Sequence, residues 1–270
     1  MIRLSVHEMN AVIESTHLGA VVDYGARLRA GVIIPSGNPV AEPEIRAMLP
    51  DGVSALVTRL PLRGSSEPEL LNMLDGLHAA AKLLADAGVG VIVFHCTAVS
   101  TFAPHLAEDI RARISRATGI PSFATSDAIL TACEALNAER LWLLTPYLED
   151  VHKREIEFLR AAGKVVVGDA CLGINTNDAM ARLSPDELLN WATGIVSSTL
   201  DADLCFLSCT ALRSAPVISP LESLTRRPVI TSNQAMVWYL LRSAGLADAV
   251  AGFGALFNCT PTCRLPKSDN

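Results

Sequence analysis

The chain has 270 residues, of which 50% are hydrophobic and 19% charged, and its formal net charge is -6. This composition is typical of a globular protein with a large core and one or two domains, and the acidic balance argues against a general nucleic-acid-binding protein. Charged residues, glycine or proline interrupt every apolar stretch within roughly 10 residues, whereas a membrane-spanning helix needs ~20. We therefore expect no membrane association.

The N-terminal segment and the cysteines bear on the cellular compartment. Residues 1–16 include Glu8 and Glu14 and lack the apolar stretch of a signal peptide. Seven cysteines are an odd number for a disulfide framework. The sequence therefore predicts a cytoplasmic protein with reduced thiols, most of which pack as small apolar side chains.

Short β-rich runs alternate with longer amphipathic segments along the chain. The apolar spacing predicts helices that end at glycines or begin at caps, as in the capping box of Ser184, Pro185 and Glu187 and the proposed N-cap Ser232. In chain order, we expect strands over 30–34, 54–60, 89–95, 140–145, 164–169, 203–208 and 227–232, and helices over 67–88, 148–163, 184–201 and 232–245. This alternation predicts an α/β fold with mostly parallel sheets, whose ligands bind beyond the carboxyl ends of the strands.

The order of elements is repeated in the two halves of the chain. The motif Pro-Ser-Gly-Asn follows the first strand and Cys-Thr-Ala the third, while in the second half Thr-Pro-Tyr and a second Cys-Thr-Ala take these places. We therefore predict two pseudo-symmetric Rossmann-like lobes with an active-site cleft between them. The expected divisions are an N-terminal extension (1–28), a first lobe (29–138), a second lobe (139–250) and a C-terminal segment that packs back or frays (251–270).

The repeated cysteines, Cys96 and Cys209, come directly after a strand and at or near the start of the next helix. The free N–H groups of a helix N-terminus lower the pKa of a thiol and also bind carboxylates. Each cysteine is followed by a hydroxyl, from Thr97 or Thr210. As a matched pair, the two cysteines predict catalytic thiols that face each other across the cleft.

The other candidate side chains fit simpler interpretations. Cysteines in or beside strands are usually packing residues, and we interpret Cys133, Cys171 and Cys205 in this way. His95 adjoins Cys96, but strand neighbours point to opposite faces, so we expect a core or supporting histidine. The cysteines and histidines lack the spacing of a zinc site, and the sequence has no phosphate-binding glycine loop, so we expect no metal.

Several of these motifs together resemble the aspartate/glutamate racemase superfamily, above all its branch of maleate cis–trans isomerases and arylmalonate decarboxylases. The resemblance covers about residues 30–245 and includes the two Cys-Thr motifs, IIPSGN, LLTPY and LGINTND. In that branch an Asn follows the first strand, Thr-Pro-Tyr follows the fourth, and a second Asn precedes the second cysteine. The matching positions here are Asn38, Tyr147 and Asn177, with Asn175 close to the last.

The resemblance implies an enzyme that uses no metal or organic cofactor, acts on a small carboxylate or dicarboxylate, and forms a homodimer. Because both cysteines are present, it favours an isomerase in which the Cys96 thiolate adds to a cis double bond, the bond rotates, and elimination follows with Cys209 as acid/base partner. The expected substrate-binding residues are Asn38, Tyr147, Asn177, Thr97, Ala98, Thr210, Ala211 and Ser36.

Alternatives to this isomerase stay open at the level of the sequence. A racemase would use the two thiols to remove and return an α-proton on opposite faces, and an arylmalonate-type decarboxylase belongs to the same superfamily. A further hypothesis is a non-catalytic protein that binds a carboxylate. Discrimination between substrates is expected from loops 64–70 and 172–178, which would close over the site.

Overall fold

The computed structural model describes residues 22–103, 105–196 and 202–260. The predicted N-terminal extension up to residue 21 and the end of the predicted C-terminal segment from 261 lie outside these residues. The described elements are β1 (Leu28–Pro35), α2 (Ala41–Met48), β2 (Val53–Leu60), α3 (Glu67–Asn72), η1 (Met73–Gly76), α4 (Leu77–Asp86), β3 (Val91–Phe94), α5 (Thr97–Ser100), α6 (Leu106–Thr118), β4 (Ser122–Ala124), α7 (Thr125–Ala135), β5 (Arg140–Thr145), α8 (Glu149–Ala161), β6 (Val165–Cys171), α9 (Asn177–Arg182), α10 (Pro185–Val196), β7 (Leu204–Leu207), η2 (Ala215–Val217), α11 (Ile218–Thr225), β8 (Val229–Thr231), α12 (Ser232–Ser243) and η3 (Ala255–Asn258).

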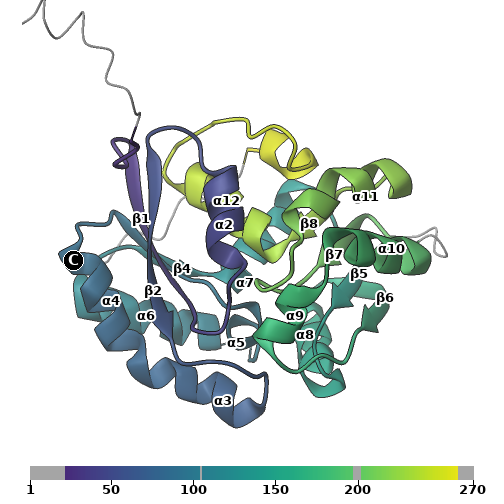
Figure 1. Ribbon diagram of the computed structural model, residues 1–270, viewed down its shortest axis with the longest axis horizontal. Helices are drawn as coiled ribbons and strands as arrows, with labels where there is room; N and C mark the ends of the chain where they lie inside the picture. The colour runs from purple at the N-terminus through teal and green to yellow at the C-terminus, as the bar shows by residue number, and fades with distance from the viewer. Residues whose placement is uncertain (1–21, 104, 197–201, 261–270) are drawn as a thin grey trace, which may run out of the picture.

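The strands form two parallel four-stranded sheets with the same topology. The strand order is β2-β1-β3-β4 in the first half and β6-β5-β7-β8 in the second. Figure 1 shows the two sheets side by side, the first half of the chain on the left and the second on the right. The predicted α/β fold with two related lobes is confirmed. The sequence analysis missed β4, a strand of three residues.

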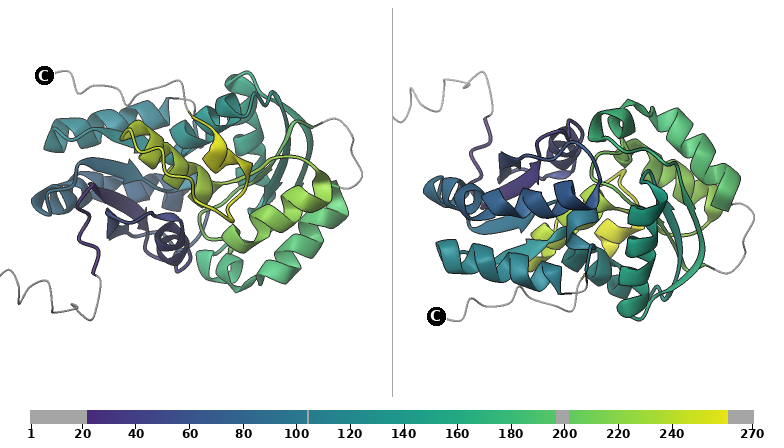
Figure 2. Two further views of the ribbon diagram at one scale, coloured as in Figure 1. Left: turned by 90° about the horizontal axis from the view of Figure 1, so that it is seen from above. Right: turned by 90° about the horizontal axis from the view of Figure 1, so that it is seen from below.

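Alternate residues of the strands enter two apolar layers, as expected for sheets that are covered on both faces. Val32 and Leu143 face one layer with α2, α7, α8 and α12, whereas Ile33 and Leu144 face the other with α4, α6, α10 and α11. Both layers contain residues from both halves of the chain. The two views of Figure 2 show helices on both sides of the sheets.

Helices α7 and α12 occupy equivalent places, since each follows the last strand of its sheet. They pack against each other, and α12 also contacts α2 of the first half. Phe123, at the end of the first sheet, meets Tyr239 of α12 edge to face with ring centroids 4.7 Å apart. The last helix of the second half therefore packs on the first half, and the lobe boundaries given above stay a prediction.

Two helix termini test the expected caps. The predicted capping box is confirmed, because Ser184 N donates to Glu187 Oε2 at 2.8 Å and Glu187 N donates to Ser184 Oγ at 3.2 Å. The predicted N-cap Ser232 is wrong by one residue. Thr231 is the N-cap, and it exchanges hydrogen bonds with Gln234, which leaves the Ser232 hydroxyl free for another contact.

The segment predicted as one helix over 67–88 is three pieces, α3, η1 and α4. The short segment η1 separates the two α-helices and ends at Gly76, where a Cβ atom would lie 2.6 Å from Leu60 Cδ2 of β2. The chain comes this close to the sheet because residue 76 has no side chain. Within the described residues, no helix has the length and apolar character to span a membrane.

Candidate active site

Cys96 lies two residues after the end of β3 and is the N-cap residue of the short helix α5. Its backbone is extended, with φ -149°. The thiol is buried, and burial raises its pKa to about 12, although hydrogen bonds from the N–H groups of Val99 and Ala98 act in the opposite direction. The expected N–H groups are therefore present at this sulfur, but the effect of burial on the pKa is larger than theirs.

Cys209 lies two residues after the end of β7, in a different backbone geometry. Its φ is +114°, a region that residues with a side chain rarely adopt. Burial raises the pKa of this thiol to about 11, whereas hydrogen bonds from the N–H groups of Ala211 and Leu212 and from Tyr147 lower it. The expected helix start is absent here, since the chain turns and the next α-helix, α11, begins only at Ile218.

The two cysteines line one small cavity between the halves of the chain. Its volume is about 10 Å³, close to the lower limit for holding one water molecule. The structure is therefore a closed form, and a substrate can enter only after a movement of the lining residues. Five of the predicted binding residues also line this cavity: Thr97, Ala98, Tyr147, Asn177 and Thr210.

The remaining three predicted binding residues do not line this cavity, and Ser36 is exposed beside a different pocket. Asn38 donates from Nδ2 to Thr210 Oγ1 at 2.9 Å and accepts at Oδ1 from the N–H groups that begin α2. Ser36 Oγ accepts from Leu62 N at 3.1 Å, and Ala211 N donates to Cys209 Sγ at 3.3 Å. In the closed form these residues hold the lining in place.

The two loops expected to close over the site meet each other beside the cavity. Ser65 donates from N and Oγ to Asn175 Oδ1, both at 3.1 Å. Asn177 N donates to Arg63 O at 3.1 Å, and its side chain lines the cavity. Asn177 is thus the asparagine that faces the cysteines, whereas Asn175 joins the loops.

Sequence reasoning missed an apolar part of the lining. Pro35, Leu62, Leu70 and Met180 face the same cavity as the two thiols, and Met180 Sδ lies 3.7 Å from Cys209 Sγ. These residues belong to the end of β1, a loop, α3 and α9, all distant in sequence from either cysteine. Their apolar character alone is what any core position would show, so the sequence holds no signal that separates them.

Ser232 was also missed as a site residue, because it was interpreted as a helix cap. Its hydroxyl accepts from Thr97 Oγ1 at 2.8 Å and from Cys209 N at 3.0 Å. One oxygen therefore joins the residue after the first cysteine to the backbone of the second. This contact fixes the relative positions of the two thiols across the halves of the chain.

Behind Cys96, a buried polar chain begins at His95, which is fully buried as expected for a supporting residue. His95 Nε2 lies 2.8 Å from Asn233 Oδ1, and Asn233 Nδ2 donates to Glu44 Oε2 at 2.7 Å. Burial lowers the pKa of His95 to about 4, so the ring is neutral near pH 7. Because Asn233 Oδ1 only accepts, Nε2 carries the proton.

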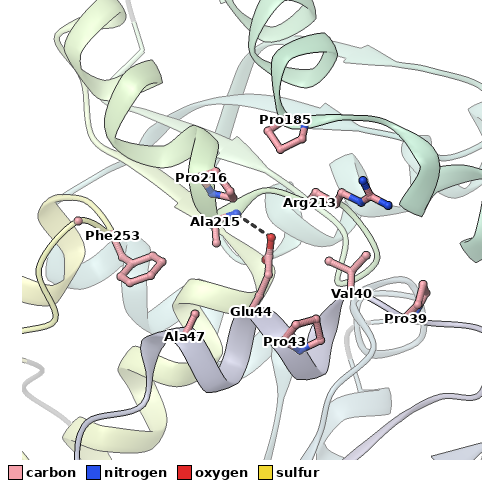
Figure 3. A pocket seen from close by; sticks show the side chains of 11 residues that line it. Pro39, Val40, Pro43, Glu44, Ala47, Pro185, Arg213, Ala215, Pro216 and Phe253 are labelled. Atoms are coloured by element: carbon pink, nitrogen blue, oxygen red, sulfur yellow. Dashed lines mark hydrogen bonds between the residues drawn. The ribbon is translucent and has the colours of Figure 1, made fainter.

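Glu44 closes this polar chain at the wall of a larger pocket of about 670 Å³. Figure 3 shows its carboxylate bonded to the backbone of Ala215, at 2.8 Å, between prolines and Phe253. Ser214 Oγ donates to the same carboxylate at 3.3 Å. The pocket is lined by neither cysteine, so it is separate from the small cavity. Among the described residues, no group of three His, Cys, Asp or Glu side chains could hold a metal ion.

The family model described as arylmalonate decarboxylase matches residues 30–257. The chain belongs to this family. Both the fold and the branch of the superfamily inferred from the sequence are thereby confirmed.

The relatives in this family are named maleate isomerase or arylmalonate decarboxylase. The chain is 26% identical over 243 residues to a maleate isomerase of Pseudomonas putida, covering 85% of this chain and 97% of the relative. It is 29% identical over 231 residues to the arylmalonate decarboxylase of Bordetella bronchiseptica, covering 84% and 95%. These relatives are enzymes.

Solved structures of the family share the whole architecture. A maleate isomerase from Pseudomonas putida, solved with maleate, has a TM-score of 0.82 at 25% identity and covers 86% of this chain and 97% of its own. A liganded arylmalonate decarboxylase variant has a TM-score of 0.80 at 27% identity, covering 86% and 99%. The two-sheet arrangement described above is therefore the family fold.

Proposed function

We propose that the protein is a cofactor-independent isomerase of a small dicarboxylate, most like maleate cis–trans isomerase. The observation that carries the proposal is the pair of thiols, Cys96 and Cys209, on one cavity that also holds Tyr147, Asn177 and two threonines. A substrate between the thiols would meet a nucleophile on one side and a proton donor on the other.

The proposed reaction uses both sulfurs and balances without a cofactor. The Cys96 thiolate forms a C–S bond to one alkene carbon, and the Cys209 thiol gives its proton to the other. Rotation about the resulting single bond follows. The Cys209 thiolate then removes a proton, the C–S bond breaks, and the trans alkene leaves with the Cys96 thiolate restored.

Negative charge develops on a substrate carboxylate during addition and elimination. The N–H groups of Ala98 and Val99 converge at Cys96, and those of Ala211 and Leu212 at Cys209. Such preorganised donors stabilise developing charge in a water-poor site. Tyr147 and Asn177 add polar groups on the same lining.

The closed cavity implies that ionisation of Cys96 accompanies opening. Burial is the main reason for the raised pKa of this thiol, and opening of the loops would restore hydration and lower it. The N–H groups would then act as expected from the sequence. A solved Nocardia farcinica maleate isomerase carries a succinylcysteine intermediate, which is the class of adduct proposed here.

The direct test is proton NMR of maleate with the purified protein. We expect the vinyl signal of maleate to be replaced by that of fumarate, and Cys96→Ala to abolish the change while its circular dichroism matches the wild type. Full conversion by Cys96→Ala would disprove the mechanism. The homodimer and the cytoplasmic location stay predictions and are tested separately by light scattering and by fractionation.

A decarboxylase of an aryl- or alkylmalonate is the second candidate. The apolar side chains of Leu62, Leu70 and Met180 on the lining favour an apolar substituent on the substrate, and the decarboxylase relative is 29% identical. Release of carbon dioxide from phenylmalonate, with maleate left unchanged, would favour this candidate. Decarboxylation would then require Cys209 and not Cys96.

A further inference from the structure

The residue before each cysteine points away from the cavity toward a buried acid. Before Cys209 this residue is Ser208, whose Oγ lies 2.8 Å from Glu155 Oε1 and 3.0 Å from Oε2. Ser208 N donates to Leu144 O at 2.8 Å, which pins the residue to the end of β5. Glu155 is 1% exposed, and nothing in the proposed reaction uses it.

The geometry around Glu155 fits a neutral carboxyl group. A hydroxyl has one proton, so Ser208 can donate to only one carboxylate oxygen at a time. A protonated carboxyl can donate to Ser208 Oγ from one oxygen and accept from it at the other, which accounts for two short distances to the same atom. None of the ion pairs found among the described residues includes Glu155.

The contrast with Glu44 supports this assignment. Glu44 receives hydrogen bonds from Asn233, Ser214 and Ala215 and lines an open pocket, whereas Glu155 has Ser208 as its hydrogen-bond partner among the described residues. A buried carboxylate with a single donor is costly, and the usual response is to keep the proton. Burial raises the pKa of Glu155 to about 8, against about 7 for Glu44.

The titratable groups around Glu155 come from four elements, β5, β6, β7 and α8, or from the residues that follow them. Cys209 lies after β7 and Tyr147 after β5, and both are buried groups on which a negative Glu155 acts. His152, on the same helix, is bonded to Thr145 at 2.9 Å and to Asp169 of β6 at 3.0 Å. After burial, which is the larger cause, the charge of Glu155 raises the pKa of Cys209.

We propose that Glu155 is a positioning residue for Cys209: with Ser208 it holds the cysteine in place, and a proton on its carboxyl favours ionisation of Cys209. An ionised Glu155 would place a second negative charge beside the thiolate in a dry site. The proposal rests on the proposed function only in giving Cys209 an acid/base role.

The test measures thiol reactivity and needs no substrate. Alkylation of Cys209 and Cys96 by iodoacetamide is followed by peptide mass spectrometry over a pH series, in the wild type, in Glu155→Gln and in Glu149→Gln. Glu149 lies on the same helix but is exposed, so it is the matched control. Cys96 lines the same cavity and reports any common change of access.

Below about pH 8, we expect the same alkylation rate of Cys209 in the wild type and in Glu155→Gln. Above that pH, Cys209 should be alkylated up to roughly tenfold more slowly in the wild type. Cys96 and the Glu149→Gln variant should show no such separation. Identical Cys209 profiles at every pH, or an equal change at Cys96, would overturn the proposal.

Ser208→Ala provides a second, independent variant if Glu155→Gln does not fold. Loss of the hydroxyl removes the donor to the carboxylate, so the inflection of the Cys209 profile should move to higher pH. A move to lower pH would contradict the assignment. A protein that fails to isomerise maleate but shows these profiles would separate the failure of the proposed function from that of this inference.

Discussion

The two cysteines follow equivalent strands and begin the same Cys-Thr-Ala motif, yet their surroundings differ. Cys96 has an ordinary extended backbone and caps a helix, whereas Cys209 has φ +114° and is followed by a turn. Next to Cys96, the neutral His95 is linked through Asn233 to Glu44, which has several hydrogen-bond donors. Next to Cys209, Ser208 is hydrogen-bonded to the buried Glu155. A repeated motif therefore gives two thiols of different character.

The difference fits two distinct chemical roles for the two thiols. The first thiol is held in a relaxed geometry with two N–H donors, as a nucleophile requires. The second combines backbone strain, a tyrosine hydroxyl and a nearby titratable carboxyl. Strained backbone of this kind persists where the surrounding structure imposes it and is frequent at functional sites.

The largest expected effect is on turnover. Cys96→Ser and Cys209→Ser should each lower kcat for maleate by at least about a thousandfold, because each removes a group that reacts in the proposed mechanism. Their covalent chemistry should differ. Intact-protein mass spectrometry should find a maleate adduct on Cys96 in the Cys209→Ser protein and none on Cys209 in the Cys96→Ser protein; the reverse pattern would exchange the two roles.

The buried acids give the next largest effect, on the pH dependence of stability. Between about pH 4.5 and pH 8 the folded protein keeps a proton on Glu155 that the unfolded chain has lost. The unfolded state therefore binds fewer protons, and stability falls as the pH rises through this window. Glu155→Gln should remove this fall, which is on the order of 5 kcal/mol for a shift of this size.

Urea unfolding at several pH values measures this effect. Glu44→Gln is the matched comparison, and its contribution should be smaller and complete by about pH 7, where the Glu44 pKa lies. A Glu155→Gln protein with the same pH dependence as the wild type would show that the buried carboxyl is ionised throughout the window.

Glycine at each cysteine compares the two backbones directly. At Cys209 the positive φ costs a residue with a side chain about 1 to 3 kcal/mol, so Cys209→Gly should be more stable than Cys209→Ala by about 1 kcal/mol. At Cys96 glycine only adds chain entropy, and Cys96→Gly should be less stable than Cys96→Ala by about 0.5 to 1 kcal/mol. Urea unfolding measures both differences. If glycine were more stable than alanine at both cysteines, or less stable at both, the two backbones would not differ as described.

The same comparison shows how far the sequence could lead. Strand ends and the two Cys-Thr-Ala motifs are local signals, so the cysteines and the parallel sheets were predictable. The φ of Cys209 was not, because an identical motif at Cys96 has φ -149°. Contacts such as Cys209 to Ser232, or Ser208 to Glu155, join segments far apart in the chain, and only the folded packing brings them together.

The smallest expected effect concerns closure of the cavity. The loop of the first half is joined to the second by Ser65 with Asn175 and by the ion pair of Glu67 with Arg154, 2.5 Å apart. The hydrogen bonds are worth about 1 kcal/mol and the partly exposed ion pair less. Asn175→Ala should therefore favour the open form up to about fivefold and Arg154→Ala about twofold.

Because productive binding requires closure, these changes should appear as a lower kcat/KM for maleate, with faster alkylation of both cysteines in the open form. Lys153→Ala is the matched control, since Lys153 pairs with the exposed Glu149 on the same helix and does not reach the loop. Slower alkylation in Asn175→Ala would mean that these contacts do not hold the cavity shut, and that access to the two thiols is set instead by the apolar lining at Leu62, Leu70 and Met180.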